Sequence, residues 1–105
     1  MKRAFVLLTK DATALNQDAI GKAFDMVGWW HWFPQAWVFV DPTGVQTAVS
    51  IRDRVMSACP NLVFYVFQLD ISAGYAGFAP SDWEDWLKTN FKSSPSTNWS
   101  ALMKR

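Results

Sequence analysis

Apolar and polar positions along the chain predict an alternation of strands and helices. Residues 4–9 (AFVLLT) form a short, nearly continuous apolar run, which is typical of a strand buried on both faces. Residues 62–69 (LVFYVFQL) form the strongest strand pattern in the chain, because their alternation places apolar side chains on both faces. Two of the predicted strands therefore need cover on both sides.

Apolar residues at helical spacing predict three helices. The first has Asn16 as its N-cap and ends at Gly28. The second lies within residues 45–59 and ends before a proline. The third begins near Ser81, which forms a capping box with Glu84.

An aromatic segment, residues 28–40 (GWWHWFPQAWVFV), lies between the first two predicted helices. Pro34 and Gln35 interrupt it, which predicts a β-hairpin. The resulting order predicts an α+β fold, a ferredoxin-like β-α-β-β-α-β sandwich with an added C-terminal helix. Residues 1–91 are expected to form this domain, and the polar, Ser-rich residues 92–105 a flexible or loosely docked C-terminal tail.

The second apolar face of the predicted sheet has no cover in a chain of 105 residues, because the helices can cover only one face. A second copy would supply the cover, so we expect a homodimer that pairs through an aromatic sheet face. The predicted interface consists of aromatic residues on three strands: Trp29, Trp30, Trp32, Trp37, Tyr65 and Phe67.

Charge changes this picture little. Ten Lys and Arg residues against nine Asp and Glu residues leave a formal net charge of +1, so bulk electrostatics do not indicate a nucleic acid or an anionic membrane as partner. A local basic patch stays open as an alternative. Its candidate residues for binding nucleic acid are Lys2, Arg3, Lys10, Arg52 and Arg54.

Cysteine content and the apolar runs bear on location. The single cysteine excludes an intramolecular disulfide and a zinc site built on several thiolates. The apolar runs are too short for a membrane span and the N-terminus lacks the pattern of a signal peptide. We therefore expect a cytoplasmic protein with no membrane partner and no cofactor.

Several segments carry a resemblance to a known family: residues 29–33 (WWHWF), 37–38 (WV), 51–55 (IRDRV), the strand 62–69, and Trp83 with Trp86 and Leu87. They resemble the SinR-like family of small uncharacterised proteins, over residues 3–90. That family is similar in fold to the small subunit of the CRISPR adaptation complex and to the virulence-associated protein D ribonucleases. The resemblance implies a ferredoxin-like homodimer with stacked sheets.

This sequence differs from the nuclease-bearing relatives at the end of the first predicted strand. The resemblance implies an Asp at the end of the first strand that holds a metal at the dimer axis, whereas the equivalent residue here is Lys10. Asp11 comes one residue later, so it replaces that carboxylate only if the strand ends in a bulge. No metal site is predicted.

Asp11 and His31 are the candidate catalytic residues. His31 is the single histidine, and its ordinary pKa near neutrality suits a general base in RNA cleavage. The simpler interpretation is a strand histidine that hydrogen-bonds a neighbour. In a regular strand, His31 shares a face with Trp29 and Phe33.

Other polar groups have ordinary structural interpretations. Arg52, Asp53 and Arg54 are expected to form a solvated helix face, with Arg52 lying over apolar neighbours. Cys59 is expected to be a small buried apolar residue. Acidic residues near the start of the third helix favour its dipole rather than a metal: Asp82, Glu84 and Asp85.

These observations favour a non-catalytic homodimeric binding module whose ligand is a nucleic acid or a protein. The absence of Lys and Arg between Trp29 and Trp37 favours packing over base stacking for the tryptophans. One alternative is a small endoribonuclease or deoxyribonuclease that uses Asp11, His31 or both. Another is a phage or mobile-element protein that acts by protein–protein inhibition.

Overall fold

The computed structural model describes residues 2–72, 74–77 and 81–91, with the backbone alone for Ser81 and Asp82. The chain forms two compact units, of which the first ends at Leu69 and the second begins at Asp70. The described residues form an α+β structure with one four-stranded antiparallel sheet and three helices.

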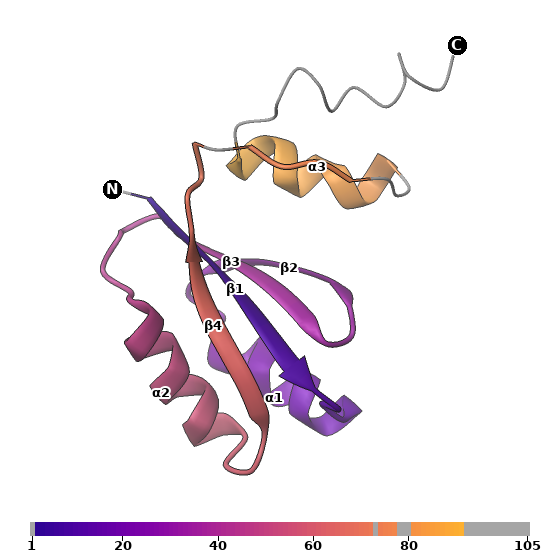
Figure 1. Ribbon diagram of the computed structural model, residues 1–105, viewed down its shortest axis with the longest axis vertical. Coiled ribbons are helices and arrows are strands. Elements are labelled where there is room, and N and C mark those ends of the chain that lie inside the picture. The colour runs from indigo at the N-terminus through magenta and orange to yellow at the C-terminus, as the bar shows by residue number, and fades with distance from the viewer. Residues whose placement is uncertain (1, 73, 78–80, 92–105) are drawn as a thin grey trace. The chain divides into compact units, whose positions relative to one another are not determined.

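The first unit contains the whole sheet (Figure 1). Its elements follow in the order β1 (Arg3–Lys10), α1 (Ala14–Ala23), β2 (Gly28–Phe33), β3 (Ala36–Asp41), α2 (Ala48–Ala58) and β4 (Val63–Leu69). The strand order in the sheet is β2-β3-β1-β4, and every neighbouring pair is antiparallel. The strands predicted from residues 4–9 and 62–69 are confirmed, as is the hairpin with Pro34 and Gln35 at its turn.

Both helices of the first unit pack on one face of the sheet, which we call the covered face. The register pairs Phe5 with Phe39 and Leu7 with Trp37, so these side chains point to the same side. Alternation along the strands therefore assigns the opposite face as well. The core on the covered face contains Phe5, Leu7, Ile20, Phe24, Trp37, Phe39, Ile51, Val55 and Cys59.

The opposite side of the sheet, which we call the open face, is also apolar. Leu8 pairs with Tyr65 and Val6 pairs with Phe67, which places these side chains together on this face. Leu8, Tyr65 and Phe67 are all exposed. Apolar residues thus line both sides of the sheet, as the pattern of residues 62–69 predicted.

Helix α1 differs from its predicted bounds at both ends. The prediction of Asn16 as N-cap is wrong, because Thr13 is the N-cap and Asn16 is the third helical residue. Their side chains accept reciprocal backbone hydrogen bonds, at 3.1 Å from Asn16 N to Thr13 Oγ1 and 3.0 Å from Thr13 N to Asn16 Oδ1. The helix ends at Ala23, and Gly28 opens β2 instead of terminating the helix.

Helix α2 begins after Thr47, which forms the same kind of capping box with Ser50. The predicted solvated face holds an exposed ion pair, with 2.8 Å from Arg52 Nη2 to Asp53 Oδ1. The arginine over an apolar neighbour is Arg54 rather than Arg52, because its guanidinium carbon lies 6.0 Å from the centre of the Phe24 ring.

The second unit contains α3 (Ser81–Asn90). The helix begins where the capping box was predicted, but the side chain of Ser81 lies outside the described residues. Glu84 forms an ion pair with Lys88, with 3.7 Å between Oε2 and Nζ, and the predicted capping box stays a prediction. The predicted tail, residues 92–105, also lies outside the described part of the chain. No helix of the described residues combines the length and the apolar character that a membrane crossing requires.

Candidate functional site

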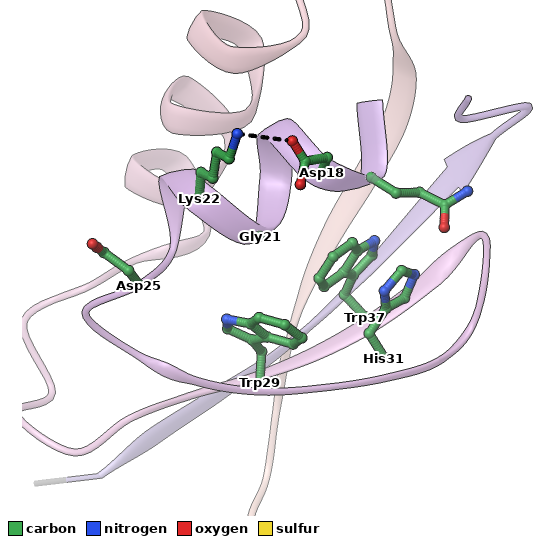
Figure 2. Close-up of a pocket in the computed structure, with 8 residues that line it drawn as sticks. Asp18, Gly21, Lys22, Asp25, Trp29, His31 and Trp37 are labelled. Carbon is green, nitrogen blue, oxygen red and sulfur yellow. Dashed lines mark ion pairs between the residues drawn. The ribbon is translucent and has the colours of Figure 1, made fainter. Parts of the chain in front are cut away.

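An open pocket of about 680 Å³ lies on the covered side, between α1 and the β2–β3 hairpin (Figure 2). Helix α1 and the loop after it contribute a polar wall, and the two strands contribute an aromatic wall. Its lining residues are Gln17, Asp18, Gly21, Lys22, Asp25, Trp29, His31 and Trp37.

A register shift within β2 keeps Phe33 out of this pocket. Trp30 pairs with Val38 and Phe33 with Ala36, so β2 uses one more residue than β3 between these two pairs. The extra residue reverses the alternation. His31 shares the pocket with Trp29, while Phe33 therefore lies with Trp30 on the open face, 5.6 Å between ring centres. The predicted common face of His31 and Phe33 is wrong for this reason.

His31 lies flat against Trp37, with 3.4 Å between ring centres and 11° between ring planes. Partial burial lowers the pKa of His31 and outweighs the opposite effect of its hydrogen bond to the Pro34 carbonyl. Nε2 lies 3.2 Å from that carbonyl oxygen, which only accepts, so Nε2 donates the proton. The neutral ring then presents Nδ1 as an acceptor.

Trp37 is the most buried aromatic residue of the pocket, with 1% of its surface exposed. The Trp29 ring meets it edge-on, at 5.3 Å between centres. The indole nitrogen of Trp37 is buried and has no hydrogen-bond partner among the described residues. An unpaired buried donor destabilises a fold and therefore marks this side chain as unusual.

The polar wall carries a net negative charge. Lys22 pairs with Asp18, with 3.0 Å between Nζ and Oδ2, and Asp25 adds a second carboxylate to the lining. Figure 2 shows these groups on and beside α1, across from the rings of Trp29 and Trp37. The pocket thus combines aromatic surfaces with acidic groups at its rim.

Asp11 lies elsewhere. It lines a second pocket of about 520 Å³ with Lys10, Asn16, Cys59 and Asn61 among its other residues. Strand β1 keeps one register with β4 up to the pair of Lys10 and Val63, so the strand does not end in the bulge that would let Asp11 replace a strand carboxylate. Asp11 follows the strand in the left-handed region, at φ 57°.

Gln35 holds the turn that contains Asp11. Its Oε1 accepts hydrogen bonds from Thr9 Oγ1 at 2.7 Å and from Ala12 N at 2.6 Å. Its Nε2 donates to the Ala12 carbonyl at 3.1 Å. The hairpin turn is thereby tied to the end of β1. The sequence pattern identified Gln35 only as a turn residue, because its partners are 23 and 26 positions away.

The structure separates the basic candidates for nucleic-acid binding. Arg3 and Lys10 lie at opposite ends of β1, and Arg3 donates to the Gln46 carbonyl at 2.9 Å. Arg52 and Arg54 lie on α2, where the first pairs with an aspartate and the second with an aromatic ring. Lys2 precedes β1 and is exposed. These residues do not form a single patch.

The predicted interface residues divide between the two faces. Tyr65, Phe67 and Trp30 lie on the open face. Trp29 and Trp37 lie on the covered face, which removes them from an interface built on the open one, because Trp37 belongs to the core of the single chain. Trp32, exposed at 45%, lies inside the register shift.

Three exposed residues of the open face were missing from the predicted interface. Leu8, Phe33 and Val63 are exposed there at 46%, 52% and 62%. Leu8 was detectable from the alternation within residues 4–9, whereas Phe33 was not, because its face depends on the register shift. Among the described residues, no group of three or more His, Cys, Asp or Glu side chains lies together as a metal site would require.

Comparison with known proteins gives no match: no family model, no curated protein and no solved structure matches this chain. The candidate site is therefore interpreted from its own residues, and the resemblance to the SinR-like family stays a prediction.

Proposed function

We propose that this chain is a non-catalytic homodimeric binding module with a ferredoxin-like fold, in which the open face of the sheet packs against the same face of a second copy. The element order β1-α1-β2-β3-α2-β4 and the sheet order β2-β3-β1-β4 support the ferredoxin-like assignment. The SinR-like resemblance agrees with this arrangement.

The observation that carries the proposal is the exposure of large apolar side chains on one continuous surface. Tyr65 is 72% exposed, Phe67 53% and Leu8 46%, on adjacent strands of the open face. Tyr65 and Phe67 also stack on each other, at 6.2 Å between ring centres. Contiguous apolar patches of this kind mark interaction sites in folded proteins.

A second copy is the partner that suits this face best. Among the strand residues that the register places there, Lys10 is the single charged one, and it lies at the end of β1. A two-fold axis lets the same patch cover itself, since each apolar residue then meets an apolar residue of the other copy. An antiparallel arrangement of the two β1 strands keeps the two Lys10 ammonium groups apart.

The nuclease alternative has less support. Asp11 and His31 line different pockets, so neither pocket combines the two candidate catalytic side chains. Lys10 is the last residue of β1, and its ammonium group repels a divalent cation at that position. No observation on the described residues favours catalysis over binding.

Light scattering of the purified protein tests the proposal, with Phe67→Lys as the disrupting variant. We expect the wild type to have twice the chain mass of 12.0 kDa at micromolar concentration. Phe67→Lys should have the mass of one chain, because a dimer of this variant would bury two unpaired ammonium groups in its interface.

Leu15→Lys is the matched control, since Leu15 is 82% exposed on α1, away from the sheet face. It should remain dimeric. A monomeric wild type, or equal dissociation of both variants, would refute pairing through the open face.

A further inference from the structure

We infer that the pocket between α1 and β2 binds a planar, uncharged heteroaromatic ring with a hydrogen-bond acceptor on its edge, the chemistry of a nucleobase. This inference goes beyond the proposed function. The pocket is formed within one chain on the covered side of the sheet, so it does not depend on the dimer.

Gly21 provides the first argument. It lies in the last turn of α1, two residues before the helix ends at Ala23, and glycine destabilises a helix relative to alanine. A Cβ at this position would lie 3.7 Å from Trp29 Cζ2 and 4.0 Å from Trp37 Cη2, which is ordinary van der Waals contact. An alanine therefore fits the fold and would improve the helix. The glycine leaves room for one methyl-sized group beside the two indole rings, at the expense of helix stability, so the edge of a ligand ring fits there.

The indole of Trp29 provides the surface that this space exposes. Its ring is 40% exposed, lines the pocket and is fixed edge-on against the buried Trp37 ring. A flat aromatic surface held in place stacks unpaired bases with little regard for their sequence. Figure 2 shows the Trp29 and Trp37 rings below the helix at Gly21.

Two hydrogen-bonding groups of opposite type line the same pocket. Trp37 has a buried N–H without a partner, and the neutral His31 ring presents Nδ1 as an acceptor. A nucleobase carries acceptors and donors on the edge of one ring. The N–H of Trp37 is fully buried, so an acceptor of the ligand pairs with it once the side chains that cover it move aside, whereas an apolar ring could not pair with it at all.

The negative charge at the rim of the pocket favours uncharged ligands over anionic ligands that carry the same ring. Asp18 and Asp25 give the lining two carboxylates against the one ammonium of Lys22. A phosphate group beside them is repelled. The pocket therefore favours a free nucleoside over a nucleotide or a nucleic-acid strand, which carry the same ring.

Titrations with three probes distinguish these sources: adenosine, adenosine 5′-monophosphate and a single-stranded oligo-dA. We expect adenosine to shift the NMR signals of the Trp29 indole and His31 ring, with weaker binding of the monophosphate and the oligonucleotide. Stronger binding of the oligonucleotide at every salt concentration would overturn the assignment to a free nucleoside. No shift with any probe would overturn the site itself.

Gly21→Ala separates a binding role from a structural one. We expect the melting temperature to rise while the affinity for adenosine falls by about tenfold, because the new methyl group occupies the space beside the rings. Trp29→Leu should also lose binding, and Trp32→Leu, a matched change at an exposed tryptophan outside the pocket lining, should keep it. Unchanged adenosine affinity in Gly21→Ala would contradict the inference.

Discussion

The two faces of the sheet carry similar apolar side chains but differ in how deeply those side chains are buried. On the covered face, Phe5 and Phe39 are almost fully buried beneath α1 and α2. On the open face, Tyr65 and Phe67 are large and aromatic as well, yet more than half of each side chain is exposed. The difference shows that an apolar strand pattern predicts which side chains favour burial but not which of them the chain covers, because Ala4 and Val40 on the open face are buried while Tyr65 and Phe67 are not.

The two faces also differ in what surrounds their aromatic rings. Phe39 stacks on Phe24, the C-cap residue of α1, at 4.4 Å between ring centres, so its neighbour comes from another element of the chain. Tyr65 and Phe67 stack on each other along one strand. The covered face is thus specified by packing within the chain, whereas the rings of Tyr65 and Phe67 on the open face are exposed and pack mainly on each other.

The largest expected effect contrasts a phenylalanine from each face. Phe39→Ala should lower the free energy of unfolding by about 3 to 5 kcal/mol, because it leaves a cavity in a closely packed core. Phe67→Ala should lower the stability of the isolated chain far less and weaken dimerisation instead. Urea denaturation below and above the dimer dissociation constant measures both effects. Equal losses of stability for the two variants at low concentration would remove the distinction between the faces.

A smaller effect concerns Asp41, on the covered face at the end of β3. This carboxylate is 3% exposed and accepts hydrogen bonds from Thr43 N at 2.9 Å, Thr43 Oγ1 at 2.6 Å and Gln46 N at 2.8 Å. Burial alone would raise the pKa of Asp41, but the hydrogen bonds from Thr43, Gln46 and Val45 outweigh it and hold the pKa below its ordinary value of 3.8. The carboxylate thereby fastens the loop that leads to α2.

Because the pKa of Asp41 is lower in the folded state, its contribution to stability is complete above pH 3.8 and is lost as the pH falls below that value. Asp41→Asn should lower the free energy of unfolding by about 1 to 3 kcal/mol at pH 7 and reduce the loss of stability in acid. Denaturation at pH 7 and below pH 4 measures both. Asp53→Asn, at an exposed carboxylate, should change neither by a comparable amount. A wild-type acid dependence retained in Asp41→Asn would contradict this role.

The smallest effect concerns the cap of α1, the helix that covers the core and forms one wall of the pocket. Thr13→Ala should lower the free energy of unfolding by about 0.5 to 2 kcal/mol, because the Asn16 N–H loses its acceptor. Asn16→Ala, which removes the reciprocal acceptor of the Thr13 N–H, should have a smaller effect in the same direction. An unchanged denaturation midpoint in Thr13→Ala would show that the helix does not depend on this cap.

Local pattern was sufficient to predict the strands, the hairpin and the apolar character of both faces, since alternation within residues 62–69 is a property of the sequence itself. It was insufficient for the N-cap of α1, because Thr13 and Asn16 are both good capping residues and their order in the reciprocal pair decides the start. Alternation alone places Trp29 and His31 on one face, but the packing of α1 against them was not predictable from local pattern. The position of Phe33 on the opposite face was not predictable either, because it depends on the one-residue register shift in β2.

The same limit explains the division of the predicted interface. Trp29 and Trp30 are neighbours in one strand, so alternation places them on opposite faces, and the pairing of β2 with β3 shows that Trp29 and Trp37 share the covered face. Gly21 was not identified and Gln35 was identified only as a turn residue, because their contacts with other elements follow from the fold and not from the local sequence pattern.

Isotope-filtered NOE spectroscopy on a mixture of labelled and unlabelled chains tests the pairing of the open faces most directly. We expect contacts between chains from Leu8, Tyr65 and Phe67, and none from the core residues Phe5 and Phe39. Contacts between chains that involve α1 and α2 but not the open face, or the absence of such contacts in a sample of dimeric mass, would contradict the account.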